Sequence, residues 1–274
     1  IMNSKTVNVN QAGELTYITF PKLAACKAVR HIFSTRLGGV SKGQFSSMNL
    51  SFRNGDPREN VEKNYSILCA AAGIDPRHLV LTRQTHTNNV RIVGKEDCGT
   101  GITKQSFEDV DGLITAEPGV ALVTQFADCT PLLFCDPVKR VAATSHAGWR
   151  GTASQIGKVT VELMVKSFGC RPEDIIAAIG PCIGPCCYEV DDPVKKAFEG
   201  TAADAPGVFS PSSNPGHYML DLRLANRAVL IDSGILPENI DVADICTCCN
   251  SSEMHSHRAT AGKRGNLAAI IELI

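Results

Sequence analysis

Short apolar runs rich in β-branched residues alternate with helical patterns, and this alternation restricts the fold of the chain more than any other feature. Runs of strand length occur at 78–82, 90–93, 120–126, 131–135, 141–144 and 175–179. Helical spacing of apolar residues appears in Val61, Tyr65, Leu68 and Ala72, in Ile156, Val159, Leu163 and Met164, and in Leu222, Ala225, Val229 and Leu230. Because strands alternate with helices but also follow one another directly, the pattern predicts an α/β protein of the α+β type, with mixed sheets flanked by helices in a layered sandwich.

The size of the chain fits one domain. Its 274 residues, 43% of them hydrophobic, are enough to bury a substantial core. The most loop-like stretch, at 200–217, is dense in glycine, proline and serine, and it is interpreted as a surface excursion within the same domain. We therefore expect residues 1–274 to form a single domain.

The charge pattern argues against two classes of partner. The net charge is −1, so there is no broad basic field, and nucleic acid is not expected to be a partner. No apolar run has the length of a membrane span, and the first residues lack the basic and apolar regions of a signal peptide. The sequence therefore favours a cytoplasmic protein that does not enter membranes, and it leaves the oligomeric state open.

Two histidines and one cysteine, each at the end of a predicted strand, are the candidate metal ligands. They are His86 in QTH, Cys129 in ADC and His146 in HAGWRG. A catalytic zinc ion takes three such ligands and keeps one position open for water or substrate. The chain has no HExxH motif and no pair of CxxC motifs, so the residue types alone are equally compatible with buried histidine and cysteine side chains of structural importance.

Three polar residues next to these ligands are candidates for the surrounding site. Gln84 lies two residues before His86 and shares its face of a strand, which favours contact with substrate or with a metal ligand. Asp128 is a candidate acid, base or orienting group, although it reaches the site only if the chain turns between it and Cys129. Arg150 follows the HAGWRG histidine at the start of a predicted helix, where it can bind phosphate or be solvated.

Two cysteine clusters stand out among the twelve cysteines. One contains Cys182, Cys186 and Cys187, and the other contains Cys246, Cys248 and Cys249. Disulfides are not expected in a reducing compartment, and the spacing of each cluster matches zinc-finger patterns poorly. Thiols packed near a site are the favoured interpretation, and a second, structural metal is the alternative.

Seven sequence blocks resemble one known family. They are FSTRLGGVSKGQFSSMNLSFRNGD at 33–56, QTH at 84–86, DGLIT at 111–115, ADC at 127–129, HAGWRG at 146–151, IGPCIGPCCYEV at 179–190 and CTCC at 246–249. The chain resembles the YfiH-like, laccase-domain family, formerly called multicopper polyphenol oxidases and now regarded as zinc-dependent purine nucleoside phosphorylases. The resemblance extends from about Phe33 to the C-terminus. It implies a sandwich of the YfiH-like cysteine-hydrolase type and a metal, zinc with copper as the alternative, held by His86, Cys129 and His146.

The resemblance also directs attention to residues outside the metal triplet. Arg36 and Asn49 lie in the first block, which favours an anion or ribose contact for each. His255 and His257 form an HxH pair that fits either a metal site or a surface loop. The family has an arginine where this chain has Arg258, but its later Gly-Arg is replaced here by Gly-Asn, so the roles of this segment stay open.

The function implied by the resemblance is phosphorolysis of purine nucleosides. Inorganic phosphate would cleave inosine, adenosine or S-methyl-5'-thioadenosine, with adenosine deamination as a side activity, and Cys129, His146 and Asp128 would act at the catalytic centre. The alternatives are a polyphenol oxidase, for which seven histidines are few, a cysteine hydrolase using Cys129 and His146, and a zinc-binding protein without turnover. Neither the preferred nucleoside nor a peptidoglycan precursor as substrate follows from the sequence.

Overall fold

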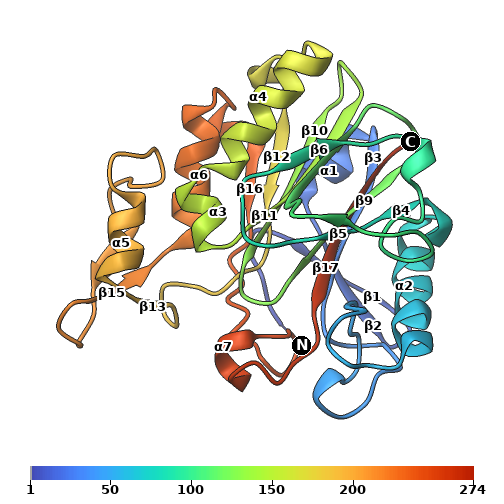
Figure 1. The fold of residues 1–274 in the computed structure, drawn as a ribbon, viewed down its shortest axis with the longest axis horizontal. Coiled ribbons are helices and arrows are strands. Elements are labelled where there is room, and N and C mark those ends of the chain that lie inside the picture. The colour runs from blue at the N-terminus through green and yellow to red at the C-terminus, as the bar shows by residue number, and fades with distance from the viewer. Residues whose placement is uncertain (1) are drawn as a thin grey trace.

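The computed structural model describes residues 2–274, and two six-stranded sheets form its centre (Figure 1). The first sheet has the order β1 (Asn8–Ala12), β2 (Leu15–Thr19), β3 (Val29–Ser34), β17 (Leu267–Leu273), β9 (Ala121–Phe126) and β4 (Leu79–Val80). Its neighbouring strands are antiparallel except for β4 and β9, which are parallel.

The second sheet is also mixed. Its order is β16 (Ile240–Val242), β12 (Ile176–Ile179), β10 (Thr130–Asp136), β11 (Val141–Ala147), β8 (Gly112–Thr115) and β6 (Val90–Ile92). The two outermost pairs, β16 with β12 and β8 with β6, are parallel, and the inner pairs are antiparallel. The predicted fold class, mixed sheets flanked by helices, is therefore confirmed.

Helices cover the outer faces of both sheets (Figure 1). Helix α2 (Arg58–Ala72) packs on the first sheet, and α4 (Ile156–Phe168) and α6 (Leu222–Asp232) pack on the second. The shorter helices are α1 (Pro21–Cys26), α3 (Trp149–Ala153), α5 (Asp192–Phe198) and α7 (His257–Thr260). Two small sheets complete the structure, one of β13 (Glu189–Asp191), β15 (His217–Leu220) and β14 (Phe209–Pro211), and one of β5 (Thr82–Arg83) and β7 (Phe107–Glu108).

The central strands are apolar along their whole length because both of their faces are buried. In β10, Leu133 and Cys135 point into the core between the two sheets, whereas Leu132 and Phe134 belong to the core beneath the helices. Such strands read as continuous apolar runs rather than as alternating patterns. The result is four layers, with the two sheets inside and helices on both outer faces.

Several details differ from the sequence-based expectation. The predicted strand at 78–82 is divided between β4 and β5, and β3 and β17 were not predicted although β17 lies at the centre of its sheet. Strand β11 continues to Ala147, beyond the predicted end of the run at 144, so His146 lies within the strand. Because β17 connects to β3 and β9 within one sheet, we propose that residues 1–274 form one domain. Among residues 2–274, none of the helices combines the length and hydropathy of a membrane-spanning helix.

Candidate metal centre

Three separate segments bring the predicted ligands together. Cys129 lies in the tight turn between β9 and β10, His146 is the penultimate residue of β11, and His86 lies in the loop between β5 and β6. Their possible ligand atoms all lie within 4.8 Å of one another. The sequence therefore predicted a grouping that the structure also contains, although the metal itself stays a prediction.

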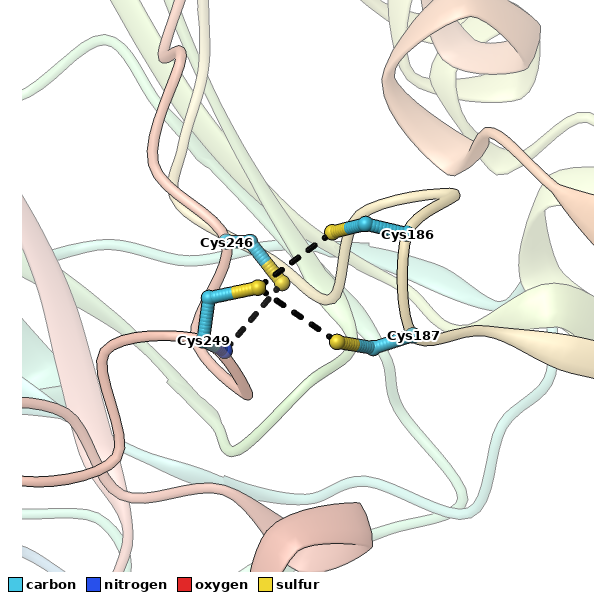
Figure 2. A group of neighbouring side chains, drawn as sticks. All are labelled: Cys186, Cys187, Cys246 and Cys249. Atoms are coloured by element: carbon cyan, nitrogen blue, oxygen red, sulfur yellow. Dashed lines mark hydrogen bonds between the residues drawn. The ribbon is translucent and has the colours of Figure 1, made fainter.

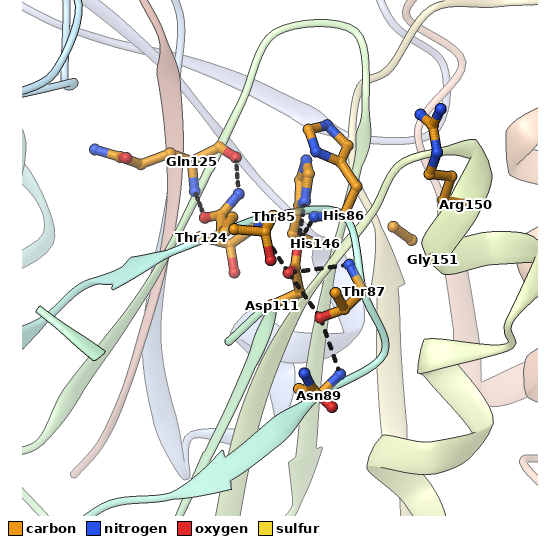
Figure 3. A network of polar contacts seen from close by, with 12 residues as sticks. Thr85, His86, Thr87, Asn89, Asp111, Thr124, Gln125, His146, Arg150 and Gly151 are labelled. Atoms are coloured by element: carbon orange, nitrogen blue, oxygen red, sulfur yellow. Dashed lines mark hydrogen bonds and ion pairs between the residues drawn. The ribbon is translucent and has the colours of Figure 1, made fainter. Parts of the chain in front are cut away.

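Asp111, just before β8, holds this arrangement in place (Figure 3). Its carboxylate accepts hydrogen bonds from the backbone N–H groups of Thr85, His86 and Thr87 at 2.9, 3.0 and 3.1 Å. It also accepts one from the Nδ1 of His146 at 2.8 Å, and its backbone oxygen accepts from the His146 N–H at 2.7 Å. One buried carboxylate thus orients two of the three candidate ligands.

The backbone near the ligands adopts conformations that side chains rarely occupy. His86 has φ +67° and Asp128 has φ +87°, and neither residue is glycine. Such conformations cost free energy and are found mainly where the surrounding structure or function requires them. Gly148 is needed for a different reason, because a Cβ there would lie 3.0 Å from both the Cys129 Sγ and the His86 Cδ2. These features keep the ligands close together.

The protonation of the site favours metal binding. Burial by itself would raise the pKa of the Cys129 thiol, but the adjacent His146 and His86 rings lower the pKa to about 6. Burial also opposes protonation of His146, yet the charges of Cys129 and Asp111 raise its pKa to about 9. Without a cation the site therefore holds a thiolate beside an imidazolium at neutral pH. A metal ion would replace the His146 proton that faces the thiolate.

The donor set fits a metal with an open position. With Nδ1 of His146 donating to Asp111, the Nε2 lone pair of the ring points to the other ligands. His146 is buried while His86 is exposed, so one side of the triplet faces solvent. Two imidazoles, one thiolate and an open side match catalytic zinc sites, and the same donors also suit copper. The residues present therefore fit the expected metal.

A cavity of about 390 Å³ opens over the triplet. His86, Asp128 and Cys129 line it, together with Tyr188 and apolar side chains that include Ile183. The volume is in the range typical of small-molecule sites, and the lining combines many ionisable side chains with a few apolar ones. A ligand in this cavity would contact the candidate metal ligands directly.

Arg264 lines the same cavity without a strong ionic partner among the described residues. Its guanidinium contacts the Gly265 carbonyl oxygen at 3.3 Å and the His257 Nδ1 at 3.4 Å, and its buried Nε has no hydrogen bond. Burial lowers its pKa, although the charges of Cys129 and Asp128 oppose this. A half-buried guanidinium that forms no ion pair with a carboxylate is only partly compensated, so the position favours an anionic ligand.

Neither Asp111 nor Arg264 was singled out from the sequence. Asp111 is the first residue of the DGLIT block, so its position at a strand start next to a glycine was the available signal. Arg264 precedes Gly265, whereas the family order has arginine after glycine, and this inversion concealed it. The contacts of Asp111 and the place of Arg264 in the cavity beside Cys129 and Asp128 both span long sequence separations, which no local pattern records.

Asp128 faces the cavity but is held by the protein. Its Oδ1 accepts a hydrogen bond from the Thr247 hydroxyl at 2.6 Å, and its Oδ2 accepts one from the Arg258 N–H at 2.7 Å. The positive φ of Asp128 supplies the turn that the sequence argument required. The structure therefore places the Asp128 carboxylate in the same cavity as Cys129, where hydrogen bonds connect it to Thr247 and Arg258.

Three other predicted site residues do not line the cavity. The side-chain amide of Gln84 exchanges two hydrogen bonds with the backbone of Gln125, at 2.7 and 2.8 Å. The guanidinium of Arg36 donates to two backbone carbonyls, and Asn49 is fully buried within a polar network under the 49–56 loop. These contacts are structural, so substrate contacts for the three residues remain predictions that need a change in conformation.

Arg150 lies at the rim of the site on a shorter helix than expected. Its exposed guanidinium stacks over the Trp149 ring at 4.2 Å, and Figure 3 shows its side chain at the start of the helix that follows His146. The predicted helix is divided into α3 and α4 by Gln155, which has φ +58°. Because α3 has only five residues, its dipole is small, and phosphate binding would depend on the Arg150 side chain.

The HxH pair is divided between two environments. His255 is buried, and burial and nearby arginines lower its pKa to about 3, whereas His257 lies at the cavity. Neither belongs to a group of at least three possible metal ligands in the described part of the chain. Arg258 lines the cavity and donates to the backbone carbonyls of Cys187 and Glu189 at 3.3 and 3.2 Å.

The fold and the site define a class of layered α/β proteins with a His–Cys–His candidate metal centre near the strand ends. The family model described as multi-copper polyphenol oxidoreductase laccase matches residues 30–274, and the chain belongs to this laccase-domain family. The predicted resemblance is therefore confirmed.

Named relatives and a solved structure agree with this membership. The chain is 38% identical over 241 residues to purine nucleoside phosphorylase YlmD of Bacillus subtilis, covering 87% of this chain and 86% of the relative. It is 34% identical over 246 residues to adenosine deaminase RL5 of an unknown prokaryotic organism, covering 88% and 94%. The crystal structure of the Bacillus licheniformis hypothetical protein YfiH superposes with a TM-score of 0.90 at 31% identity, covering 98% of this chain and 100% of that one.

Proposed function

We propose that the protein is a zinc-dependent purine nucleoside phosphorylase that cleaves inosine, adenosine and S-methyl-5'-thioadenosine with inorganic phosphate. The observation that carries the proposal is Arg264, which forms no ion pair with a carboxylate among the described residues, in a cavity that is also lined by His86 and Cys129 of the open His–Cys–His site. An anion and an uncharged, partly apolar group can occupy such a cavity together. The names of the relatives, which include phosphorylases and a deaminase, support the same substrate class.

The two arginines and the cavity wall have separate tasks in this proposal. Arg264 and Arg258 neutralise and orient the phosphate, since guanidinium groups bind phosphate oxygens through paired hydrogen bonds. Tyr188 and Ile183 present aromatic and apolar surface on which the nucleoside can pack. Holding both reactants in one cavity removes much of the entropic cost of bringing them together.

The reaction exchanges one bond at the ribose. A phosphate oxygen forms a bond to the anomeric carbon while the carbon–nitrogen bond to the purine breaks, and the purine leaves with the electron pair and takes up a proton. A zinc ion held by His86, Cys129 and His146 would supply Lewis acidity to this site when bound. Asp111 keeps the His146 ring in place, and Asp128 is positioned in the cavity to accept or return a proton.

Adenosine deamination fits the same cavity. Water would add to carbon 6 of the purine and ammonia would leave, with the proton transferred through the Asp128 carboxylate. The reaction needs no phosphate, so Arg264 is not required for it. The two activities can therefore be separated by experiment.

One observation favours a second function, a cysteine hydrolase. Cys129, His146 and Asp111 form a series of nucleophile, base and orienting carboxylate, and the lowered pKa of Cys129 provides a thiolate. In that reaction the thiolate attacks a carbonyl carbon and His146 protonates the leaving group. Bound metal would occupy the thiolate, so activity that increases after metal removal would identify the hydrolase.

The remaining alternatives fit the donor groups less well. A multicopper oxidase needs many imidazoles, but the other group of possible ligands in residues 2–274 consists of four cysteines. A storage or structural zinc protein would use a closed site, whereas this triplet is exposed on the His86 side and lies in a cavity.

The test is chromatography of zinc-loaded protein incubated with each nucleoside, with and without phosphate. We expect free base with ribose 1-phosphate, or with methylthioribose 1-phosphate from S-methyl-5'-thioadenosine, in the presence of phosphate only, and their loss in Cys129→Ala. Arg264→Gln should weaken phosphorolysis through a raised KM for phosphate but keep deamination, while the exposed Arg171→Gln serves as the matched control. No product from any nucleoside would contradict the proposal.

A further inference from the structure

Four cysteines from two distant segments meet beside the cavity (Figure 2). Cys186 and Cys187 lie in the loop before β13, and Cys246 and Cys249 lie in the loop after β16. Cys186 and Cys187 each place their sulfur 3.4 Å from the sulfur of Cys249. All four sulfurs lie within 4.8 Å of one another, and all twelve cysteines of the chain are free thiols.

This spacing is that of a tetrahedral metal site. Zinc lies about 2.3 Å from each thiolate, so the sulfurs around one ion are about 3.8 Å apart. The observed separations, from 3.4 Å to at most 4.8 Å, surround that value. Cys246 and Cys249 also have the C-x-x-C spacing that is common in zinc sites, which the sequence interpretation overlooked because it read the cluster as C-x-C-C.

The backbone around the four thiols is arranged to support negative sulfur. The N–H groups of Gly184 and Cys249 donate to the Cys246 sulfur at 3.1 and 3.5 Å. A Cβ at Gly184 would lie 3.1 Å from the Arg223 guanidinium and 3.2 Å from the Cys186 sulfur, so the glycine lets a cation approach the cluster. Arg258 contributes a second guanidinium, which donates a hydrogen bond to the Cys187 carbonyl oxygen.

We propose that Cys186, Cys187, Cys246 and Cys249 bind a second metal ion, a single tetrahedral zinc, in a closed structural site. The four thiols would lose their protons to solvent on binding, leaving a tetrathiolate with a net charge of −2 beside the two guanidinium groups. Four protein ligands leave no open position, in contrast to the His–Cys–His site.

The second metal would clamp the two loops that shape the cavity. The first loop carries Ile183 and Tyr188, which line the cavity, and the second carries Thr247, which hydrogen-bonds to Asp128. The backbones of the two loops already pair through an isolated β-bridge at Cys182 and Cys246, whose thiols are free. A structural zinc here would add stability and fix the cavity wall without taking part in a reaction.

The first test counts metal in the full-length protein purified under reducing conditions. We expect two zinc ions per chain in the wild type, one in Cys249→Ser and one in Cys129→Ala. Cys248→Ser, in the same loop but outside the group of four, should retain both. Equal zinc content in the wild type and Cys249→Ser, or no zinc in Cys129→Ala, would overturn the proposal.

The second test identifies the ligands. Cobalt-loaded Cys129→Ala should show intense sulfur-to-metal charge-transfer bands and the visible bands of tetrahedral cobalt, and Cys186→Ser in the same background should lose them. Cys186 is exposed, so this variant is suitable if Cys249→Ser does not fold. Disulfides among the four cysteines in the purified protein, with no metal uptake after reduction, would contradict the proposal. Both tests are independent of nucleoside cleavage.

Discussion

Asp111→Asn is the substitution that most clearly separates metal binding by an organised site from chance proximity of three side chains. The carboxylate accepts five hydrogen bonds, including those from the backbone N–H groups of His86, Thr85 and Thr87 and from the His146 ring. An asparagine has one acceptor oxygen. If that oxygen faces His146, the new NH₂ group faces the Thr85 and Thr87 N–H donors. In the opposite orientation the NH₂ group faces the His146 ring.

The magnitude follows from these contacts. A hydrogen bond to a charged group contributes about 1.5–3 kcal/mol, so two mismatched donors predict a loss of about 3–6 kcal/mol in folding stability. If the NH₂ group donates to Nδ1 of His146, the ring proton moves to Nε2, where the metal is expected. Loss of such an orienting partner weakens metal binding about 10- to 100-fold.

Two measurements check the prediction. Urea denaturation gives the folding stability. Zinc competition with a chromophoric chelator gives the zinc affinity, which is taken from the binding step that is absent in Cys129→Ala. Asp109→Asn is the matched control, because Asp109 is exposed, lies two residues away and has a positive φ, which asparagine tolerates; its carboxylate accepts from the side chains of Thr85 and Asn89 but from neither His86 nor His146. We expect the control to change stability and zinc affinity little. Asp111→Asn protein that binds zinc as tightly as the wild type would refute the reasoning.

Three further predictions address other parts of the structure. Gly148→Ala would place a methyl group 3.0 Å from the Cys129 Sγ and should reduce the zinc content that depends on Cys129, measured by elemental analysis; unchanged content would count against the tight packing. Arg264→Gln should raise the KM for phosphate about 10- to 100-fold, because one charge-assisted contact of about 1.5–3 kcal/mol is lost, and an unchanged KM would remove Arg264 from phosphate binding. Burial lowers the pKa of His31 to about 4, against an opposing effect of Asp241, and His31 Nε2 accepts the Phe20 N–H at 2.8 Å. Since the pKa of His31 in the folded protein lies below the ordinary value near 6.5, its contribution to the free energy of unfolding is complete above pH 6.5 and falls by about 2 kcal/mol by pH 5. His31→Gln should reduce this dependence of stability on pH, measured by urea titrations at several pH values. An identical dependence in the variant would contradict the assignment.

Much of the fold was predictable because both faces of the central strands are buried. The runs that became β9, β10, β11 and β12 are continuous apolar segments, and the helix that became α4 ends at Gly169, which has φ +66°. Strand β17 was missed although it is equally apolar, since its place beside β3 depends on pairing across most of the chain. Local patterns carry no information about such distant partners.

The candidate site was predictable only in part, for a related reason. The metal triplet follows short motifs at strand ends, where side chains from distant segments converge. Asp111 and Arg264 were missed, because their importance comes from contacts with His146 and with the cavity. Gln84 was chosen because it shares a strand face with His86 and Asn49 because of its sequence block, but the structure uses their amides to hold neighbouring segments. Motif membership alone does not distinguish a ligand contact from a loop contact.

The most direct test of the central claim is a zinc titration of metal-free protein with phosphate-dependent cleavage of inosine as the readout. The proposal predicts that the rate rises with zinc until the Cys129-dependent site is filled, and that Cys129→Ala stays inactive at every zinc concentration. Metal-free protein that cleaves inosine with phosphate as fast as the zinc-loaded protein would contradict the assignment of His86, Cys129 and His146 as the catalytic metal centre.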